Sequence, residues 1–264
     1  MRAPIVTAAT VLALLAVTAA RGADDPLALA RLLYNQHQFR AAISAADQAR
    51  LTPAHADAAD LVAARASLEQ FRASNEPDDL AKARERLRRV DPQKLSASER
   101  VEYLIGIGEA LYLDDSFGAA ADVFDSVLKG TDLVSVAARQ ELLDWWATSL
   151  DRDAKPRPEI ERRITYQRIR TRMEEELASH PGNGAALYWL AAAARGQGDL
   201  QAAWDAAEAG WVRAPLTTDR GTALRAELDQ LVLQVIAPER ARVTAQPPDT
   251  LRQDWERFKE KWSK

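Results

Sequence analysis

Apolar side chains recur at helical spacing between Ala185 and Pro215, on both sides of a turn-forming stretch at residues 196–199. The apolar positions follow an i, i+3, i+4, i+7 pattern before the turn and again after it; they are Leu187, Leu190, Ala191 and Ala194, then Leu200, Ala203, Trp204, Ala207 and Trp211. Each half therefore predicts a helix with one apolar stripe. Two such helices must bury their stripes against each other and against neighbouring helices.

The same register occurs twice earlier in the chain. In residues 104–128 the matching positions are Leu104, Ile107, Gly108, Leu111, Phe117, Ala120, Phe124, Val127 and Leu128. In residues 26–49 they are Leu29, Ala30, Leu33, Phe39, Ala42, Ala46 and Ala49. Equivalent small residues are Ala42, Ala120 and Ala203, roughly 80 residues apart, so the sequence predicts an internal repeat.

Each of these three segments resembles a tetratricopeptide repeat (TPR), a helix pair of about 34 residues. A separation of roughly 80 residues leaves room for one further helix pair, with extra residues, between successive segments. The intervening pairs are predicted at Asp57–Phe71 with Leu80–Val90 and at Asp132–Leu150 with Glu159–Ala178, with polar, proline-bearing loops at 73–79 and 152–158. The sequence departs from the repeat pattern at the turn, where the equivalents of Gly198 are Asp115 and His37.

The resemblance implies an all-α fold class, a right-handed TPR-like superhelix (α-solenoid) of about five helix pairs with C-terminal capping helices. We expect the solenoid to occupy residues 24–236. Its last apolar stripe runs from Leu224 to Val235 and is predicted to end at Pro238, because proline interrupts a helical pattern.

A separate helix is predicted near the C-terminus. Residues 237–264 are expected to form a linker and then an amphipathic helix that a capping box of Thr250 and Gln253 opens. Trp255 and Trp262 lie on one face of that helix. Two interpretations follow: the aromatic face packs back on the solenoid as a cap, or it engages a partner.

The N-terminus has the pattern of a secretory signal. Met1-Arg2 precedes an apolar run from Ile5 to Ala20 and then small residues, so residues 1–23 are predicted to be a signal peptide with cleavage between Ala19 and Ala23. The alternative is an uncleaved membrane anchor, although the run is shorter than the roughly 20 residues that a spanning helix needs. The mature chain is then expected to contain no transmembrane segment.

The chain has no cysteine, and none of its asparagines lies in an N-x-S/T pattern. Small extracellular proteins of eukaryotes usually depend on disulfides, whereas a helical-repeat core does not. We therefore expect a periplasmic or secreted protein, with a bacterial periplasm favoured over a eukaryotic secretory route.

The net charge of the chain indicates which classes of partner it is suited to bind. A formal net charge of −4 does not favour nucleic acid or anionic lipid as a partner. Basic residues nevertheless crowd 82–89, at Lys82, Arg84, Arg86, Arg88 and Arg89, and they also crowd 152–172. Each cluster is interpreted as the solvated face of a helix, with a patch for an anionic partner as the alternative.

The sequence contains no constellation that predicts catalysis, a metal site or a cofactor. His37, His55 and His180 fall in different repeats without metal-ligand spacing, and the absence of cysteine excludes a thiol nucleophile. The glycines of Gly106-Ile107-Gly108 are interpreted as helix-packing positions, because a third glycine and a preceding strand are missing. We therefore expect a protein that is not an enzyme.

A solenoid of helix pairs presents a concave face built from the first helix of each pair. By the geometry of the family, the residues expected on that face are Arg31, Tyr34, Asn35, Glu102, Glu109, Tyr112, Tyr188 and Arg195, with possible second contacts at Trp145, Trp255 and Trp262. Tyrosine and arginine are frequent anchors of protein partners.

The predicted function is an exported, non-catalytic scaffold that binds a protein or peptide along this face. The alternative is a structural or assembly subunit of a cell-envelope complex, docked through its convex basic helices and C-terminal helix. The sequence identifies neither the partner nor an oligomeric state.

Overall fold

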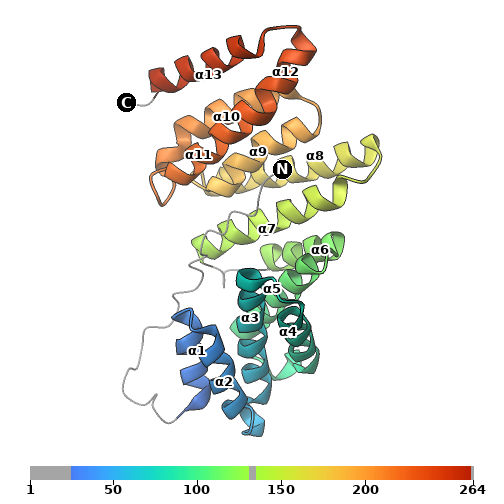
Figure 1. The fold of residues 1–264 in the computed structure, drawn as a ribbon, viewed down its shortest axis with the longest axis vertical. Coiled ribbons are helices and arrows are strands. Elements are labelled where there is room, and N and C mark those ends of the chain that lie inside the picture. Colours follow the sequence, from blue (N-terminus) through green and yellow to red (C-terminus); the bar gives the residue numbers. More distant parts are fainter. Residues whose placement is uncertain (1–24, 131–134, 263–264) are drawn as a thin grey trace. The chain divides into compact units, whose positions relative to one another are not determined.

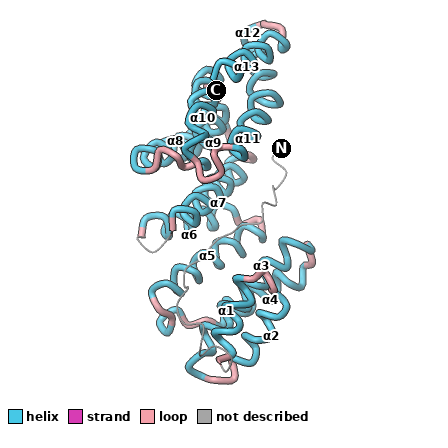
Figure 2. The backbone as a smooth tube through the Cα atoms, turned by 90° about the vertical axis from the view of Figure 1, so that its left-hand side faces the viewer, coloured by secondary structure: helices cyan, strands magenta, loops and turns pink. Residues whose placement is uncertain are grey.

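The structure is a computed structural model that describes residues 25–130 and 135–262 of the 264-residue chain. The predicted signal peptide at residues 1–23 lies outside the described residues. Within the described ranges every regular element is a helix and no strand occurs, which confirms the all-α fold class (Figure 2). The chain divides into two compact units, one up to Arg139 and one from Gln140 onward.

The first unit is built of helix pairs in chain order (Figure 1). Its α-helices are α1 (Pro26–Asn35), α2 (Phe39–Ala49), α3 (Ala56–Ser74), α4 (Pro77–Arg89), α5 (Ala97–Leu113) and α6 (Phe117–Lys129), with short 3-10 turns at Pro53–His55 and Pro92–Lys94. Helix α3 packs on α1, α2, α4 and α5, and α5 packs on α6. The first intervening pair that the sequence predicted is therefore present as α3 and α4.

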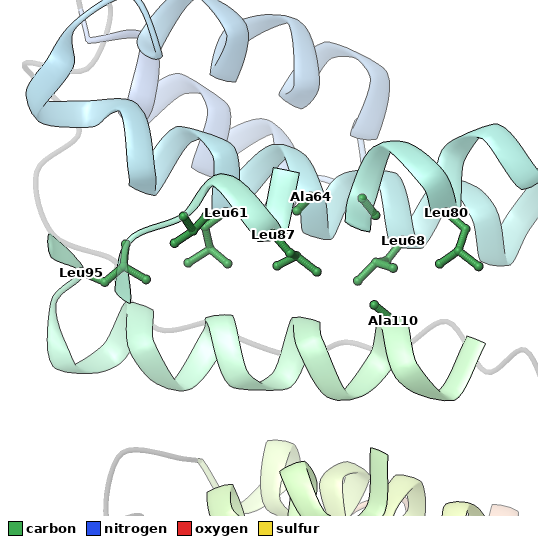
Figure 3. Packing of buried hydrophobic residues seen from close by; sticks show 9 residues of the cluster. Leu61, Ala64, Leu68, Leu80, Leu87, Leu95 and Ala110 are labelled. Atoms are coloured by element: carbon green, nitrogen blue, oxygen red, sulfur yellow. The ribbon is translucent and has the colours of Figure 1, made fainter. Parts of the chain in front are cut away.

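Leucine side chains hold the middle of the first unit together. Leu61 and Leu68 of α3 meet Leu80 and Leu87 of α4, and Ala110 of α5 closes the cluster from the other side (Figure 3). Burying one leucine side chain stabilises a fold by about 1.5–3 kcal/mol. The spacing of seven residues within each helix places each leucine pair on one face, two turns apart.

The three predicted helix pairs have turns of the same geometry. His37, Asp115 and Gly198 all adopt the left-handed conformation, with φ of 58°, 56° and 82°. Each turn also has the same backbone hydrogen bond across it, donated by the residue after the left-handed one; the bonds run from Gln38 N to Leu33 O at 2.9 Å, from Ser116 N to Leu111 O at 2.9 Å and from Asp199 N to Ala194 O at 3.0 Å. This is the Schellman arrangement that ends many helices. The three predicted helix pairs thus share one turn geometry, although only one of them has glycine there.

Small residues lie where the helices of a pair approach closely. Ala42, Ala120 and Ala203 are fully buried. At Gly108 a Cβ atom would lie 2.6 Å from the ring of Phe124, so α5 contacts α6 too closely for any side chain at that position. The interpretation of Gly108 as a packing position is confirmed.

The second unit continues the succession of helices. It contains most of α7 (Val136–Ala154), then α8 (Glu159–Ser179), α9 (Gly184–Gly196), α10 (Leu200–Arg213), α11 (Thr222–Leu231), α12 (Ala237–Thr244) and α13 (Pro248–Trp262), with a 3-10 turn at Ala214–Leu216 and a π-helical turn at Val232–Ile236. The second intervening pair is thus present as α7 and α8. The described residues contain no helix with the length and apolar content needed to cross a membrane.

Two boundary predictions near the C-terminus are wrong. The helix expected to end at Pro238 continues to Thr244, because the π-helical turn widens it just before the proline. Pro238 directly follows this π-helical turn, and prolines and π-turns are both places where a helix ladder is locally interrupted without ending. The capping box of Thr250 and Gln253 does not open α13. That helix begins at Pro248, and the N–H of Thr250 already donates to the carbonyl of Pro247, at 3.0 Å.

Candidate functional site

Charged and aromatic side chains gather where α1, α3 and α5 lie side by side in the first unit. Helix α3 contacts both of the other two helices and supplies the central residues. We call this set the α1–α3–α5 cluster; it comprises Arg31, Tyr34, Arg65, Glu69, Arg72, Glu99, Glu102 and Glu109. Four of its members, Arg31, Tyr34, Glu102 and Glu109, are residues that the sequence predicted for a binding face.

Arg65 is the centre of the cluster. Its guanidinium lies 4.8 Å from the ring centroid of Tyr34 on α1, and its Nη1 donates to Glu102 Oε2 on α5 at 3.0 Å. The arginine is buried, with 8% of its surface exposed. Its Nε is buried and finds no hydrogen-bond acceptor among the described residues. One side chain of α3 therefore joins all three helices.

Arg72 lies two turns further along α3 and joins this helix to α5. It forms ion pairs with Glu69 at 2.8 Å and with Glu109 of α5 at 3.1 Å. Residues seven apart on a helix lie on the same face, so Arg65 and Arg72 point the same way. Sequence reasoning missed both arginines, because it assigned α3 only as an intervening helix. The sequence did contain a signal for them: the two arginines are seven residues apart and so share a face of α3, next to the buried stripe of Leu61, Ala64 and Leu68.

The cluster fixes the protonation states of its central pair. Burial raises the pKa of Tyr34 to about 12, with Arg65 opposing the shift and Glu109 and Glu69 adding to it. For Arg65, burial lowers the pKa, but Tyr34, Glu102 and Glu109 outweigh burial and raise it above its ordinary value. At neutral pH the pair is therefore a neutral phenol beneath a permanently charged guanidinium.

A second contact ties α1 directly to α5. Arg31 of α1 forms an ion pair with Glu99, in the first turn of α5. Glu99 also accepts a hydrogen bond from the backbone N–H of Ser96 at 2.8 Å and so completes a capping box. Although burial raises its pKa, the hydrogen bonds with Ser96 and the charge of Arg31 lower the pKa of Glu99 below its ordinary value. Arg31 thus pairs with the Glu99 carboxylate, which the capping box at the start of α5 already orients.

The other predicted residues of the first unit lie outside these contacts. Asn35 is exposed at the last position of α1. Tyr112 is half-buried, and its ring packs edge-on against Phe117 with the centroids 5.4 Å apart. Tyr34 and Phe39 pair in the same way at 5.7 Å, so both tyrosines help to hold the two helices of their own hairpin together.

In the second unit the predicted residues are engaged within the fold. Tyr188 is buried, and its ring packs edge-on against Trp189 with the centroids 5.6 Å apart. The Arg195 Nε donates to Glu239 of α12 at 2.9 Å, and this hydrogen bond raises the pKa of the arginine. Arg195, predicted to face a binding groove, therefore forms an ion pair that joins α9 to α12.

The predicted second contacts separate into packed and exposed residues. Trp255 is fully buried between Trp204 and Trp211 of α10, and its Nε1 donates to Asp229 at 2.8 Å. Helix α13 therefore packs on the second unit through this ring, as the capping interpretation expected. Trp145 is half-buried, whereas Trp262 is 48% exposed at the end of α13.

The basic residues of α4 are paired with carboxylates of the same unit. Arg86 reaches Asp47 at 2.7 Å and Asp60 at 3.2 Å, and Arg84 reaches Asp114 at 2.7 Å. The remaining pairs join Lys82 to Asp79 and Arg89 to Glu85. These contacts support the interpretation of α4 as a solvated helix face rather than a patch for an anionic partner.

The cluster offers hydrogen-bond donors, acceptors and one aromatic ring, held by three helices. Three arginines face four glutamates, so the set carries one excess negative charge. The described residues hold no group of three or more histidine, aspartate or glutamate side chains that could bind a metal ion. Chemically, the arrangement suits recognition of polar and charged groups on a partner. No protein-family model, curated protein or solved structure matches this chain.

Proposed function

We propose that the chain is a TPR-like, right-handed superhelical scaffold that binds a protein or peptide across the α1–α3–α5 cluster. The observation that carries this proposal is the convergence of charged and aromatic side chains from three successive first helices on one face. The common apolar register of the three helix pairs, each with a left-handed residue at the equivalent position His37, Asp115 or Gly198, supports the repeat assignment.

The α1–α3–α5 cluster is not needed for the stability of the first unit, because an apolar interface between the same helices would serve as well. Replacing a buried ion network by well-packed apolar residues is often neutral or stabilising by about 1–4 kcal/mol. A network of arginines, glutamates and a tyrosine is therefore costly compared with an apolar seam between the same helices. Arginine and tyrosine are among the residue types most enriched at binding hot spots, so we attribute the retention of this network to recognition of a partner.

The remaining features of the proposed scaffold concern its place in the cell and its chemistry. We propose that residues 1–23 direct its export, so that the mature protein acts in the periplasm or outside the cell. We also propose that it is not an enzyme and uses no cofactor. Binding energy would then come from complementarity of shape and charge along the face.

The alternative of a structural subunit docked through α4 and α13 has less support. The cations of α4 have carboxylate partners within the first unit. The central tryptophan of α13 is buried in the second unit, which leaves Trp262 as its exposed ring.

Affinity capture from the native envelope tests the proposal. The bait is the purified protein, compared with the Arg31→Ala and Glu102→Gln variants, and captured proteins are identified by mass spectrometry. We expect both variants to lose at least about tenfold in affinity for the captured protein, about 1.4 kcal/mol, with thermal unfolding nearly unchanged for Arg31→Ala. The matched control is Arg88→Ala, an exposed arginine on α4.

Capture that survives both substitutions, or that depends only on the presence of α13, would overturn the proposal. The second of these outcomes would favour the structural-subunit alternative.

A further inference from the structure

A separate groove lies on the first unit between α2 and the pair α3–α4. Its volume is about 930 Å³, and it is lined by residues of these three helices and of the turn before α2. None of its lining residues belongs to the α1–α3–α5 cluster. It is therefore a second hollow surface, distinct from the proposed binding face.

Unequal helix lengths create this groove. Helix α2 has 11 residues and α3 has 19, which correspond to about 16 Å and about 28 Å of helix. The two helices pack together, so the C-terminal part of α3 extends beyond the start of α2. Residues 73–79 were predicted as a loop, but apart from Asn75 and Glu76 they form the end of α3 and the start of α4, and Ala73, Ser74 and Asp79 line the groove.

The floor of the groove is apolar. Phe39 and Ile43, one turn apart on α2, are both half-buried and line it. The Phe39 ring also packs against Tyr34, with the centroids 5.7 Å apart. The groove therefore offers an apolar surface that an aliphatic or aromatic side chain can cover.

The wall of the groove has one cation in excess. Of its three cations, Arg86 is bound to Asp47 and Lys82 to Asp79, the two lining carboxylates. The third, Arg40, is exposed and makes no ion pair or hydrogen bond with any described residue. The side-chain amide of Gln70, across the groove on α3, is also without a hydrogen bond within the described part of the chain.

From this arrangement we infer that the groove binds an acidic segment of another protein, with a carboxylate on Arg40 and an adjacent apolar side chain on Phe39 and Ile43. Charge complementarity selects the carboxylate, since the groove's own carboxylates are already paired. The groove is open rather than enclosed, which suits an extended peptide better than a small molecule that a pocket must surround. An unbonded amide beside the floor can in addition hydrogen-bond to the backbone of such a peptide.

Selection from a displayed library of random peptides tests this inference with the purified protein as target. We expect enriched peptides to carry aspartate or glutamate next to aliphatic or aromatic residues. A synthetic peptide from the enriched set is then titrated by fluorescence anisotropy against the wild type, Arg40→Glu and Arg88→Glu. Arg88 is the matched control, because it is exposed on α4 but does not line the groove.

Arg40→Glu should weaken binding at least about tenfold, and Arg88→Glu less than about twofold. Equal losses in both variants would indicate a diffuse charge effect and overturn the inference, as would an enriched set without acidic residues. Peptides weakened by Arg31→Ala but not by Arg40→Glu would bind the α1–α3–α5 cluster instead; they would support the proposed function and overturn this inference. Peptides that Arg40→Glu weakens but Arg31→Ala does not would bind the groove. They would support this inference independently of the proposed function.

Discussion

The guanidinium of Arg65 lies 4.8 Å from the ring centroid of Tyr34, and this contact joins α3 to α1 at the centre of the first unit. The same arginine reaches Glu102 on α5. Three helices that are separate in the sequence thus depend on one buried cation. The stability of the first unit and the shape of its proposed binding face therefore have a common origin.

Removing Arg65 should destabilise the first unit strongly. Arg65→Leu leaves Glu102 without its cation; breaking a fully buried pair from one side costs about 3–5 kcal/mol of unfolding free energy, and we expect less here because the Glu102 side chain is 26% exposed. The double variant Arg65→Leu/Glu102→Leu should regain most of that loss, because neither charge is then left unpaired. Urea unfolding measures both, with Arg88→Leu as an exposed control. Equal stability of Arg65→Leu and Arg88→Leu would contradict the assigned role of the cluster.

The raised pKa of Tyr34 makes the first unit sensitive to alkaline pH. The pKa moves from its ordinary value of 10.0 to about 12 in the fold. Above pH 10 the unfolded chain loses this proton while the folded chain keeps it, so the contribution to stability is complete below pH 10 and is lost as pH rises towards 12. Tyr34→Phe should remove this part of the pH dependence. The difference in tyrosinate absorbance between wild type and variant should titrate near pH 12 rather than near 10.

The left-handed turns predict stabilising substitutions. His37 and Asp115 hold φ of 58° and 56°, a region that costs about 1–2 kcal/mol for residues other than glycine, and less for aspartate. His37→Gly and Asp115→Gly should therefore raise the free energy of unfolding by about 1 kcal/mol or less, and Gly198→Ala should lower it by about 1 kcal/mol. Thermal unfolding checks this. Gln38→Gly is the control, because Gln38 has a φ of −90° and should gain nothing.

Two neighbouring glycines of α5 should respond in opposite ways to the same change. A methyl group at Gly108 would lie 2.6 Å from the Phe124 ring, so Gly108→Ala should destabilise by about 1–3 kcal/mol. At Gly106 the nearest atom, Leu87 Cδ2, is 3.4 Å away. Gly106→Ala should therefore be neutral or stabilise by up to about 1 kcal/mol, because alanine favours a helix more than glycine does. Similar losses in both variants would show that the close α5–α6 contact is not as described.

Local spacing was enough to predict the helix pairs. The apolar stripes predicted both helices of each pair, and their register predicted the equivalence of His37, Asp115 and Gly198, which share a left-handed φ. This worked because a helix hairpin is determined by residues close in sequence. The failures at Pro238 and Thr250 have the opposite cause. The π-helical turn at Val232–Ile236 lets the helix continue past Pro238, and α13 begins at Pro248, before the predicted capping residue Thr250.

The site was less predictable than the fold. Arg65 and Arg72 were missed because their partners Tyr34, Glu102 and Glu109 come from helices α1 and α5, far from them in sequence. Residues that were nominated by their register, such as Tyr188 and Arg195, are engaged within the second unit instead. The helical period predicts on which face of its helix a residue lies. It does not predict which side chain from a distant part of the sequence contacts that residue.

Site-specific photo-crosslinking in the native cell is the most direct test of the proposed binding face. A photoreactive phenylalanine analogue replaces Asn35, which is exposed on α1 one turn after Arg31 and makes none of the cluster's contacts, or Arg88, exposed on α4. We expect a discrete crosslinked protein from position 35 and none from position 88. Crosslinks from position 88 or from position 262 alone, with none from position 35, would contradict the proposed binding face.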